Sequence, residues 1–316
     1  MTLNEAAFKR ALPLREDPAA FGATCVQRGG VWVVDCGVDS AGGTAAGLAM
    51  AESSMGGLGH VTLSAGGVPG AGFPWPMVGA ASDSPVAACL AAQYAGWKVS
   101  TKGYFAMASG PMRAAIGREE LFDEIGLRER PPVAVGLLET ASLPPDDVCG
   151  SLAEAAGVAP DHLLLLAART ASVAGTLQVV ARSLETALHK LHDLRFDLTR
   201  VVRGSGTAPL PPIPADDLAA IGRTNDAILY GGAVTIDVTG DDASLAAIGP
   251  RAVSRSSASY GEPFAVLFDR AGRDFYALDP ALFAPAMLTL VNIDTGHRHV
   301  FGACAPDILA RSFTTD

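Results

Sequence analysis

Cysteine is scarce in this chain of 316 residues, and the five cysteines that occur lie far apart. No two of them, and no cysteine–histidine pair, have the spacing of a zinc-binding motif, so we expect no structural zinc site. An odd, scattered set is typical of reduced thiols and indicates the cytoplasm. The positions are Cys25, Cys36, Cys89, Cys149 and Cys304.

Long hydrophobic runs and an excess of basic residues are also missing. The longest apolar run, LeuLeuLeuLeuAlaAla at 163–168, is far too short to cross a bilayer. Residues 1–17 lack the apolar core and cleavage site of a secretory signal. The formal net charge of −10 argues against nucleic acid, which needs a basic stripe on the protein. We therefore expect neither a membrane nor a nucleic acid as a partner.

The composition is that of a compact globular protein, since 49% of the residues are hydrophobic and 18% are charged. Strand-like runs at 132–139 and 163–168 alternate with helical patterns at 144–157 and 173–194, which predicts an α/β or α+β layered fold. Residues 197–214 contain four prolines and read as a loop that crosses between domains.

The helical stretch 173–194 carries two stripes. Its leucines and alanines recur at steps of three and four residues and form a buried face. Polar side chains form a second stripe at about 100° per residue. This stripe could form the floor of a polar cleft, but its spacing alone favours a solvent-facing helix that has an Arg–Glu pair at i, i+3. Its members are Gln178, Arg182, Glu185 and His189.

Two other patterns point away from a cofactor or a metal. GlyGlyLeuGly at 56–59 follows a predicted helix and precedes a strand, which is the reverse of the order in a dinucleotide-binding unit. His297 and His299 alternate on a predicted strand, but no third residue near them has the spacing of a metal-binding motif. We predict no metal site and no dinucleotide cofactor.

Several blocks, in order and through nearly the whole chain, resemble methenyltetrahydromethanopterin cyclohydrolases, pterin enzymes of one-carbon metabolism. The similarity is weakest over residues 1–20, 25–47 and near Asp241. The matching blocks are residues 56–61, 85–97, 108–114, 178–190, 222–232, 261–264 and 275–286.

The resemblance implies two α/β domains with a substrate cleft between them, a homotrimer, and neither a metal nor an external redox cofactor. We place one discontinuous domain at 1–84 plus 200–316, and the other, with the catalytic helix, at 85–199. The implied reaction is the reversible hydrolysis of a 5,10-methenyl pterin to its 5-formyl form. The catalytic arginine and glutamate of the family fall on Arg182 and Glu185.

This pair suits the chemistry. The methenyl carbon lies between two nitrogens and shares their positive charge, so it is already electrophilic. A carboxylate at Glu185 can take a proton from the attacking water and also attract the cation. A guanidinium three residues away can orient that carboxylate and keep it ionised.

Other polar residues are candidates for contacts with the substrate. Gln178 and His189 share the stripe with the catalytic pair. Asn225 and Asp226 present an amide and a carboxylate that match the edge of a pterin, or alternatively form an Asx turn or a helix cap. Arg113, Arg223 and Lys190 suit an anionic tail of the substrate, or are simply solvated charges.

Two other functions remain open at this point. A non-catalytic pterin-binding relative would keep the cleft without the chemistry, although the presence of both Arg182 and Glu185 speaks against it. A cyclohydrolase acting on a folate is the second alternative, because the sequence does not separate methanopterin from folate.

Overall fold

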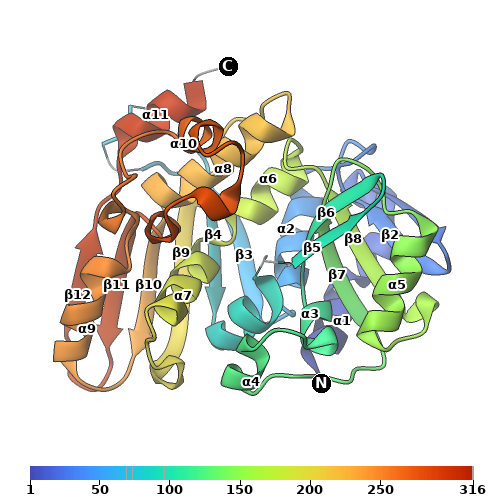
Figure 1. Ribbon diagram of the computed structural model, residues 1–316, viewed down its shortest axis with the longest axis horizontal. Coiled ribbons are helices and arrows are strands. Elements are labelled where there is room, and N and C mark those ends of the chain that lie inside the picture. Colours follow the sequence, from blue (N-terminus) through green and yellow to red (C-terminus); the bar gives the residue numbers. More distant parts are fainter. Residues whose placement is uncertain (69, 73, 95–96, 315–316) are drawn as a thin grey trace. The chain divides into compact units, whose positions relative to one another are not determined.

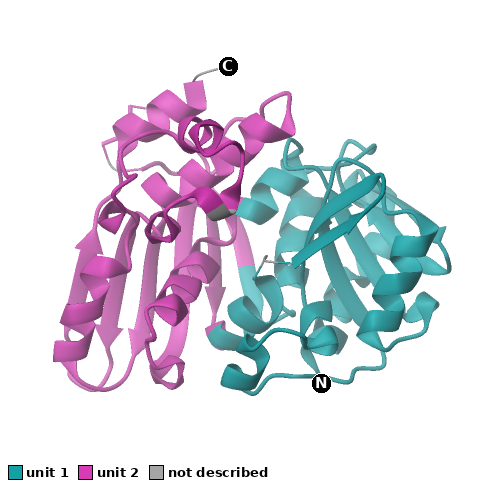
Figure 2. Ribbon diagram, in the orientation of Figure 1, with its two compact units in different colours: residues 1–60, 86–179 teal, residues 61–85, 180–316 magenta. Residues whose placement is uncertain are grey.

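The computed structural model describes residues 1–68, 70–72, 74–94 and 97–314 and falls into two compact units. Unit 1 is Met1–His60 with Val86–Val179, and unit 2 is Val61–Pro85 with Val180–Asp316 (Figure 2). Each unit is built on one six-stranded sheet with helices packed against it (Figure 1). The predicted two-domain α/β class is therefore confirmed.

The division of the chain differs from the predicted 1–84 plus 200–316 and 85–199. Residues 1–60 belong with the middle of the chain, and residues 180–199 belong with the C-terminal part. Strand pairing is the reason: β2 (Val31–Asp35) lies parallel to β8 (Leu163–Ala168), and the N-terminal segment thereby completes the sheet of unit 1.

In unit 1 the strand order is β1-β2-β8-β7-β6-β5. The remaining strands are β1 (Thr24–Arg28), β5 (Trp97–Thr101), β6 (Tyr104–Ser109) and β7 (Ala134–Glu139). The helices are α1 (Leu3–Glu16), α2 (Thr44–Ser54), a π-helix (Val86–Gln93), α3 (Met112–Ile116), α4 (Leu121–Ile125), α5 (Asp146–Ala156) and α6 (Val173–Val180).

The apolar run at 163–168 is the central strand β8, and both of its faces are covered. Leu163 and Leu165 belong to a core cluster with residues of α3 and α5. Leu164 and Leu166 belong to a second cluster with residues of α1 and α2. A strand that is buried on both faces has no solvent side, and this explains the continuous run of leucines.

Helix α2 is rich in small residues and packs closely, as its composition predicts. A Cβ on Gly47 would lie 3.0 Å from the Cα of Ala174 and 3.0 Å from the Cβ of Leu177. The neighbour of α2 is therefore α6 of the same chain.

In unit 2 the strand order is β12-β11-β10-β9-β4-β3. Strand β3 begins in the last residues of the first segment of unit 1. The strands are β3 (Gly59–Ser64), β4 (Met77–Ser82), β9 (Val201–Pro209), β10 (Ala233–Val238), β11 (Met287–Asn292) and β12 (Arg298–Gly302). The helices are α7 (Ser183–Asp193), α8 (Asp217–Gly231), α9 (Asp242–Ile248), α10 (Phe264–Arg270) and α11 (Pro306–Thr314). Short 3-10 helices cover residues 18–21 and 160–162 in unit 1 and residues 198–200, 249–251, 254–256, 275–277 and 280–282 in unit 2.

The expected loop at 197–214 contains the nine-residue strand β9, which pairs with both β10 and β4. Gly204 and Gly206 are buried and face α7, whereas Arg203, Ser205 and Thr207 are exposed on the opposite face of the strand. The prediction of a loop was wrong because the glycines and prolines, which are typical of loops, were given more weight than this alternation of buried and exposed residues. No helix in the described ranges is both long and apolar enough to cross a membrane.

Candidate functional site at the start of α7

The helical stretch predicted over 173–194 is interrupted at Ala181 and Arg182, which form a turn between α6 and α7. Arg182 is the N-cap residue of α7, with φ −88° and ψ 9°. Its carbonyl oxygen accepts hydrogen bonds from the backbone N–H (2.8 Å) and the hydroxyl (2.9 Å) of Thr186. The polar stripe therefore does not run along one continuous helix, and Gln178 lies on the helix before the turn.

The predicted catalytic pair lies at this helix start in unit 2. Arg182 precedes the first turn, and Glu185 is the third residue of α7. Both side chains are buried, with exposed fractions of 7% and 6%. Charged side chains are rarely buried to this degree unless they are paired, and each takes part in further interactions with the surrounding chain. Glu185 lies in the first turn of α7, where the helix dipole favours a negatively charged side chain.

Further along α7 the predicted residues have different surroundings. The His189 Nε2 lies 3.7 Å from an Asp193 carboxylate oxygen, and the side chain remains partly exposed. The Lys190 ammonium is buried and donates a 2.9 Å hydrogen bond to the carbonyl oxygen of Pro280. Burial lowers the pKa of Lys190, so this lysine is not the solvated surface charge that the sequence left open.

The three candidate residues on α8 form hydrogen bonds within unit 2. Arg223 donates to the carbonyl oxygen of Pro212 at 3.0 Å, and the Asn225 amide donates to the carbonyl oxygen of Ile221 at 2.8 Å within the helix. Asp226 is fully buried, and its Oδ1 accepts a 2.8 Å hydrogen bond from the backbone N–H of Phe264, the first residue of α10. This is a helix-capping contact made from another helix.

Two candidates lie in unit 1. Gln178 is buried on α6. The Arg113 guanidinium is 1% exposed, forms an ion pair with Glu119 and lies 4.8 Å from the centre of the Tyr94 ring. It also donates to the carbonyl oxygen of Leu90. Arg113 is therefore held in the interior of unit 1 and is not a solvated surface charge.

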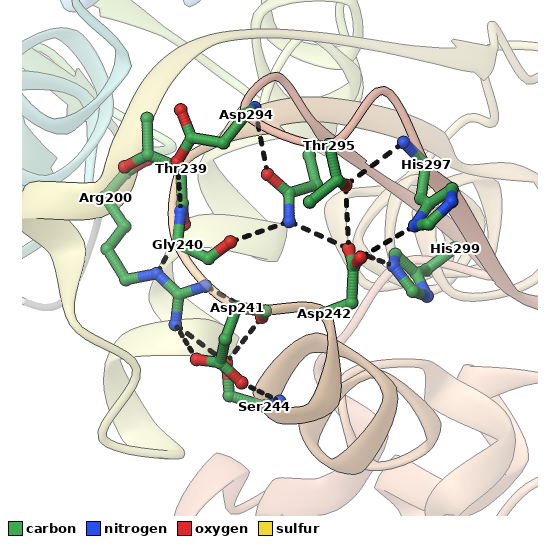
Figure 3. Close-up of polar contacts among 11 residues, drawn as sticks. Arg200, Thr239, Gly240, Asp241, Asp242, Ser244, Asp294, Thr295, His297 and His299 are labelled. Carbon is green, nitrogen blue, oxygen red and sulfur yellow. Dashed lines mark hydrogen bonds and ion pairs between the residues drawn. The ribbon is translucent and has the colours of Figure 1, made fainter.

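A polar cluster that the sequence did not predict lies at one end of the sheet of unit 2 (Figure 3). The Asp242 carboxylate accepts hydrogen bonds from His297 Nδ1 (2.7 Å), His299 Nε2 (2.9 Å) and the Asn292 amide (2.8 Å). These donors lower the pKa of Asp242, with His299 contributing most. The carboxylate partner of the two histidines thus comes from a distant part of the chain, which sequence spacing alone does not reveal.

Further hydrogen bonds in the same cluster hold the segment after β10 against Arg200 and against the turn after β11. Arg200 donates to the carbonyl oxygen of Thr239 at 2.6 Å and to the hydroxyl of Ser244 at 2.8 Å, and the backbone N–H of Gly240 donates to Asp294 at 2.7 Å. Within the described part of the chain, no group of three or more His, Cys, Asp or Glu residues is arranged to hold a metal ion.

A pocket of about 450 Å³ lies in unit 2, lined by residues from segments 258–262, 267–271 and 277–279. Three charged residues are part of its lining: Glu262, Arg270 and Asp279. Glu262 and Arg270 form a 3.0 Å ion pair. Lys190 connects α7 to this region, because it bonds Pro280, the residue after Asp279.

The family model described as Cyclohydrolase (MCH) matches residues 2–313. A methenyltetrahydromethanopterin cyclohydrolase of Methylobacillus flagellatus is 43% identical over 286 residues, which cover 90% of this chain and 86% of that protein. The protein of the same name from Methylobacterium sp. (strain 4-46) is 45% identical over 89% of this chain and 87% of its own length. The one from Methanospirillum hungatei is 39% identical over 90% of this chain and 89% of its own length.

Proposed function

Because the chain belongs to the cyclohydrolase (MCH) family, we propose that it hydrolyses 5,10-methenyltetrahydromethanopterin reversibly to the 5-formyl derivative in one-carbon metabolism. The observation that carries the proposal is the burial of Arg182 and Glu185 together at the start of α7. A buried carboxylate and a buried guanidinium within one helical turn supply the base and the hydrogen-bond donor that hydration of an activated carbon requires.

In the proposed reaction Glu185 is the general base. A water oxygen forms a bond to the methenyl carbon while one of its protons passes to the Glu185 carboxylate. The bond from this carbon to N10 then breaks, the formyl group stays on N5, and N10 takes up a proton. Of the two protons of the water, one ends on N10 and the other is released to solvent.

Arg182 has two tasks in this scheme. Its guanidinium orients the Glu185 carboxylate, and it donates to the oxygen that develops on the former methenyl carbon. The substrate carbon is cationic and reacts with a deprotonated water directly, so the scheme assigns no step to a metal or a redox cofactor.

The remaining site residues and the assembly are part of the same proposal. Six further residues are proposed to support substrate binding: Gln178, His189, Asn225, Asp226, Arg223 and Arg113. The homotrimer rests on the family resemblance, and the exposed face of the unit 2 sheet, where Val300 is 57% exposed, offers a surface for it.

The test follows the loss of the ultraviolet absorbance of the methenyl cation. Wild-type protein should turn over the methanopterin substrate, and Glu185→Gln should lower kcat by about 10²–10⁴-fold while substrate still binds. Glu16→Gln, at an exposed helical position, is the matched control. A Glu185→Gln protein with near-wild-type kcat would refute the role of this residue. Wild-type protein that binds the substrate without turnover would make the chain a binding protein, and faster turnover of methenyl folate would change the substrate.

A further inference from the structure

Two buried glycines of β9 face the helix that carries the catalytic pair. Gly204 pairs with Ile236 and Gly206 pairs with Val234 on β10, so both lie in the middle of the sheet. Glycine weakens a strand interior, and at such a position it often marks the close approach of another segment. Here the approaching segment is the first turn of α7.

The space above Gly206 is already filled. A Cβ at this position would lie 2.5 Å from the Ser183 hydroxyl oxygen and 2.9 Å from the backbone nitrogen of Leu184. A backbone nitrogen cannot rotate away, so a side chain at Gly206 would have to displace the first turn itself. A Cβ at Gly204 would instead meet the Leu184 Cδ1 at 2.7 Å, and the end of a leucine side chain has room to turn.

Ser183 fits this interpretation. Its side chain is fully buried, and its hydroxyl makes no hydrogen bond within the described part of the chain. A small residue at this position therefore serves contact with the strand rather than helix capping. Ser183 and Leu184 stand between Arg182 and Glu185 in the sequence. The contact of these two residues with β9 therefore sets the distance of both catalytic side chains from the sheet.

We infer that Gly206 is a positioning residue for the cyclohydrolase reaction, because it lets the first turn of α7 rest directly on β9 and so fixes where Glu185 and Arg182 lie. The inference rests on the proposed function. A base that is displaced by about 1 Å from its productive geometry can cost about 10²-fold in rate. Gly206 acts on turnover only through the two residues that it positions.

The test compares three glycine substitutions in one sheet. Gly206→Ala should lower kcat by about 10–100-fold, with a smaller change in KM. Gly204→Ala should have a smaller effect. Gly79→Ala is the matched control: its Cβ would lie 2.8 Å from the Thr62 hydroxyl oxygen, so it is similarly crowded, but it pairs with Thr207 on the face away from α7. The control should lower the melting temperature without a comparable loss of kcat per folded molecule.

A second-site change separates positioning from general damage. Ser183→Gly removes the hydroxyl that a Gly206 side chain would meet first, so the Gly206→Ala, Ser183→Gly double variant should recover part of the lost kcat. Recovery of melting temperature without recovery of kcat would overturn the inference. If Gly206→Ala alone does not fold, the Gly206→Ala, Ser183→Gly double variant provides the test, because the Leu184 backbone nitrogen still crowds the new Cβ, and a kcat equal to that of Gly79→Ala overturns the inference.

The Glu185→Gln variant distinguishes failure of the positioning role of Gly206 from failure of the proposed function. An inactive Glu185→Gln with a fully active Gly206→Ala overturns the positioning role and leaves the proposed function standing. An active Glu185→Gln overturns the proposed role of that glutamate, and with it the positioning role of Gly206.

Discussion

Asp226 in the middle of α8 holds the first residue of α10, because its Oδ1 accepts the backbone N–H of Phe264 at 2.8 Å. The carboxyl group is fully buried, and this burial raises its pKa to about 7. The Phe264 N–H and the Ser312 hydroxyl offset the shift only in part. A group that looks like a substrate contact in the sequence is therefore also a structural acid that titrates near neutral pH.

Replacing Asp226 with asparagine should flatten the dependence of stability on pH. Between the ordinary value of 3.8 and about 7, the folded wild-type protein keeps a proton that the unfolded chain releases, so its stability falls as the pH rises. The asparagine side chain cannot ionise, and its amide oxygen can still accept the Phe264 N–H. Urea unfolding at pH 5 and pH 8 should show that Asp226→Asn gains stability relative to wild type at the higher pH, by up to a few kcal/mol.

The control for this measurement is Asp161→Asn, at an exposed position of unit 1. It should leave the pH dependence of the wild-type protein unchanged. An Asp226→Asn protein whose stability changes between pH 5 and pH 8 as much as that of wild type would contradict the prediction.

Asp242 should behave in the opposite sense. Its pKa is lowered by donors from His299, His297 and Asn292, so its contribution to stability is complete above 3.8 and is lost as the pH falls through the lowered value. Asp242→Asn should therefore unfold at a lower temperature than wild type at pH 7, and the difference should shrink below pH 4. Thermal unfolding across this range tests the prediction, and a difference that is constant with pH would exclude an ionic origin.

Asn4 joins three parts of unit 1 from a fully buried position. Its amide donates to the Pro111 carbonyl oxygen (2.8 Å) and to Glu129 (2.9 Å), and its Oδ1 accepts the Val135 N–H (3.1 Å). Asn4→Ala leaves buried polar groups without partners and should lower the free energy of unfolding by about 2–4 kcal/mol. Thr2→Ala, which removes only the cap of α1, should cost about 1 kcal/mol in the same urea titration. Equal losses would show that the bridging role of Asn4 is minor.

Arg182 should affect both turnover and substrate binding under the proposed mechanism. Arg182→Ala removes the group that orients Glu185 and should lower kcat by about 10²–10³-fold and raise KM. Arg182→Lys keeps the charge but not the forked donors, so it should recover only part of the activity. Arg118→Ala, at an exposed position, is the control for steady-state kinetics. Full activity of the lysine variant would mean that charge alone suffices.

Local patterns in the sequence predicted secondary structure reliably where burial of apolar side chains dominates. The apolar run at 163–168 predicted a strand, and the structure has the strand β8 there, buried on both faces. The turn at Ala181–Arg182 was not visible, because the leucine spacing continues across it and neither residue is a helix breaker. Strand β9 was missed because its glycines, which normally mark loops, are required by the contact with α7.

Hydrogen-bond and ion-pair partners that lie far apart in the chain could not be predicted from the sequence, for a different reason. Asp242 and His297 are brought together only when β10 and β11 pair in parallel, which no local pattern specifies. In the same way, Arg113 and Asp226 were identified by residue type, but their surroundings depend on Glu119 and Phe264 in the folded chain. The family resemblance pointed to Arg182 and Glu185 as the proposed catalytic pair, and the structure adds that both residues are buried.

The interleaved course of the chain has a consequence for folding during synthesis. Strand β4 pairs with β9, and Met77 lies opposite Pro209, so this strand leaves the ribosome long before its partner. Unit 1 has all of its residues once Val179 has been made, whereas β3 and β4 must wait for the C-terminal part. Contacts between such distant residues slow folding and leave strand edges open for longer. The nascent chain should therefore be most prone to aggregation after unit 1 has formed and before β9 emerges, when a chaperone that shields exposed strands would have the greatest effect on yield.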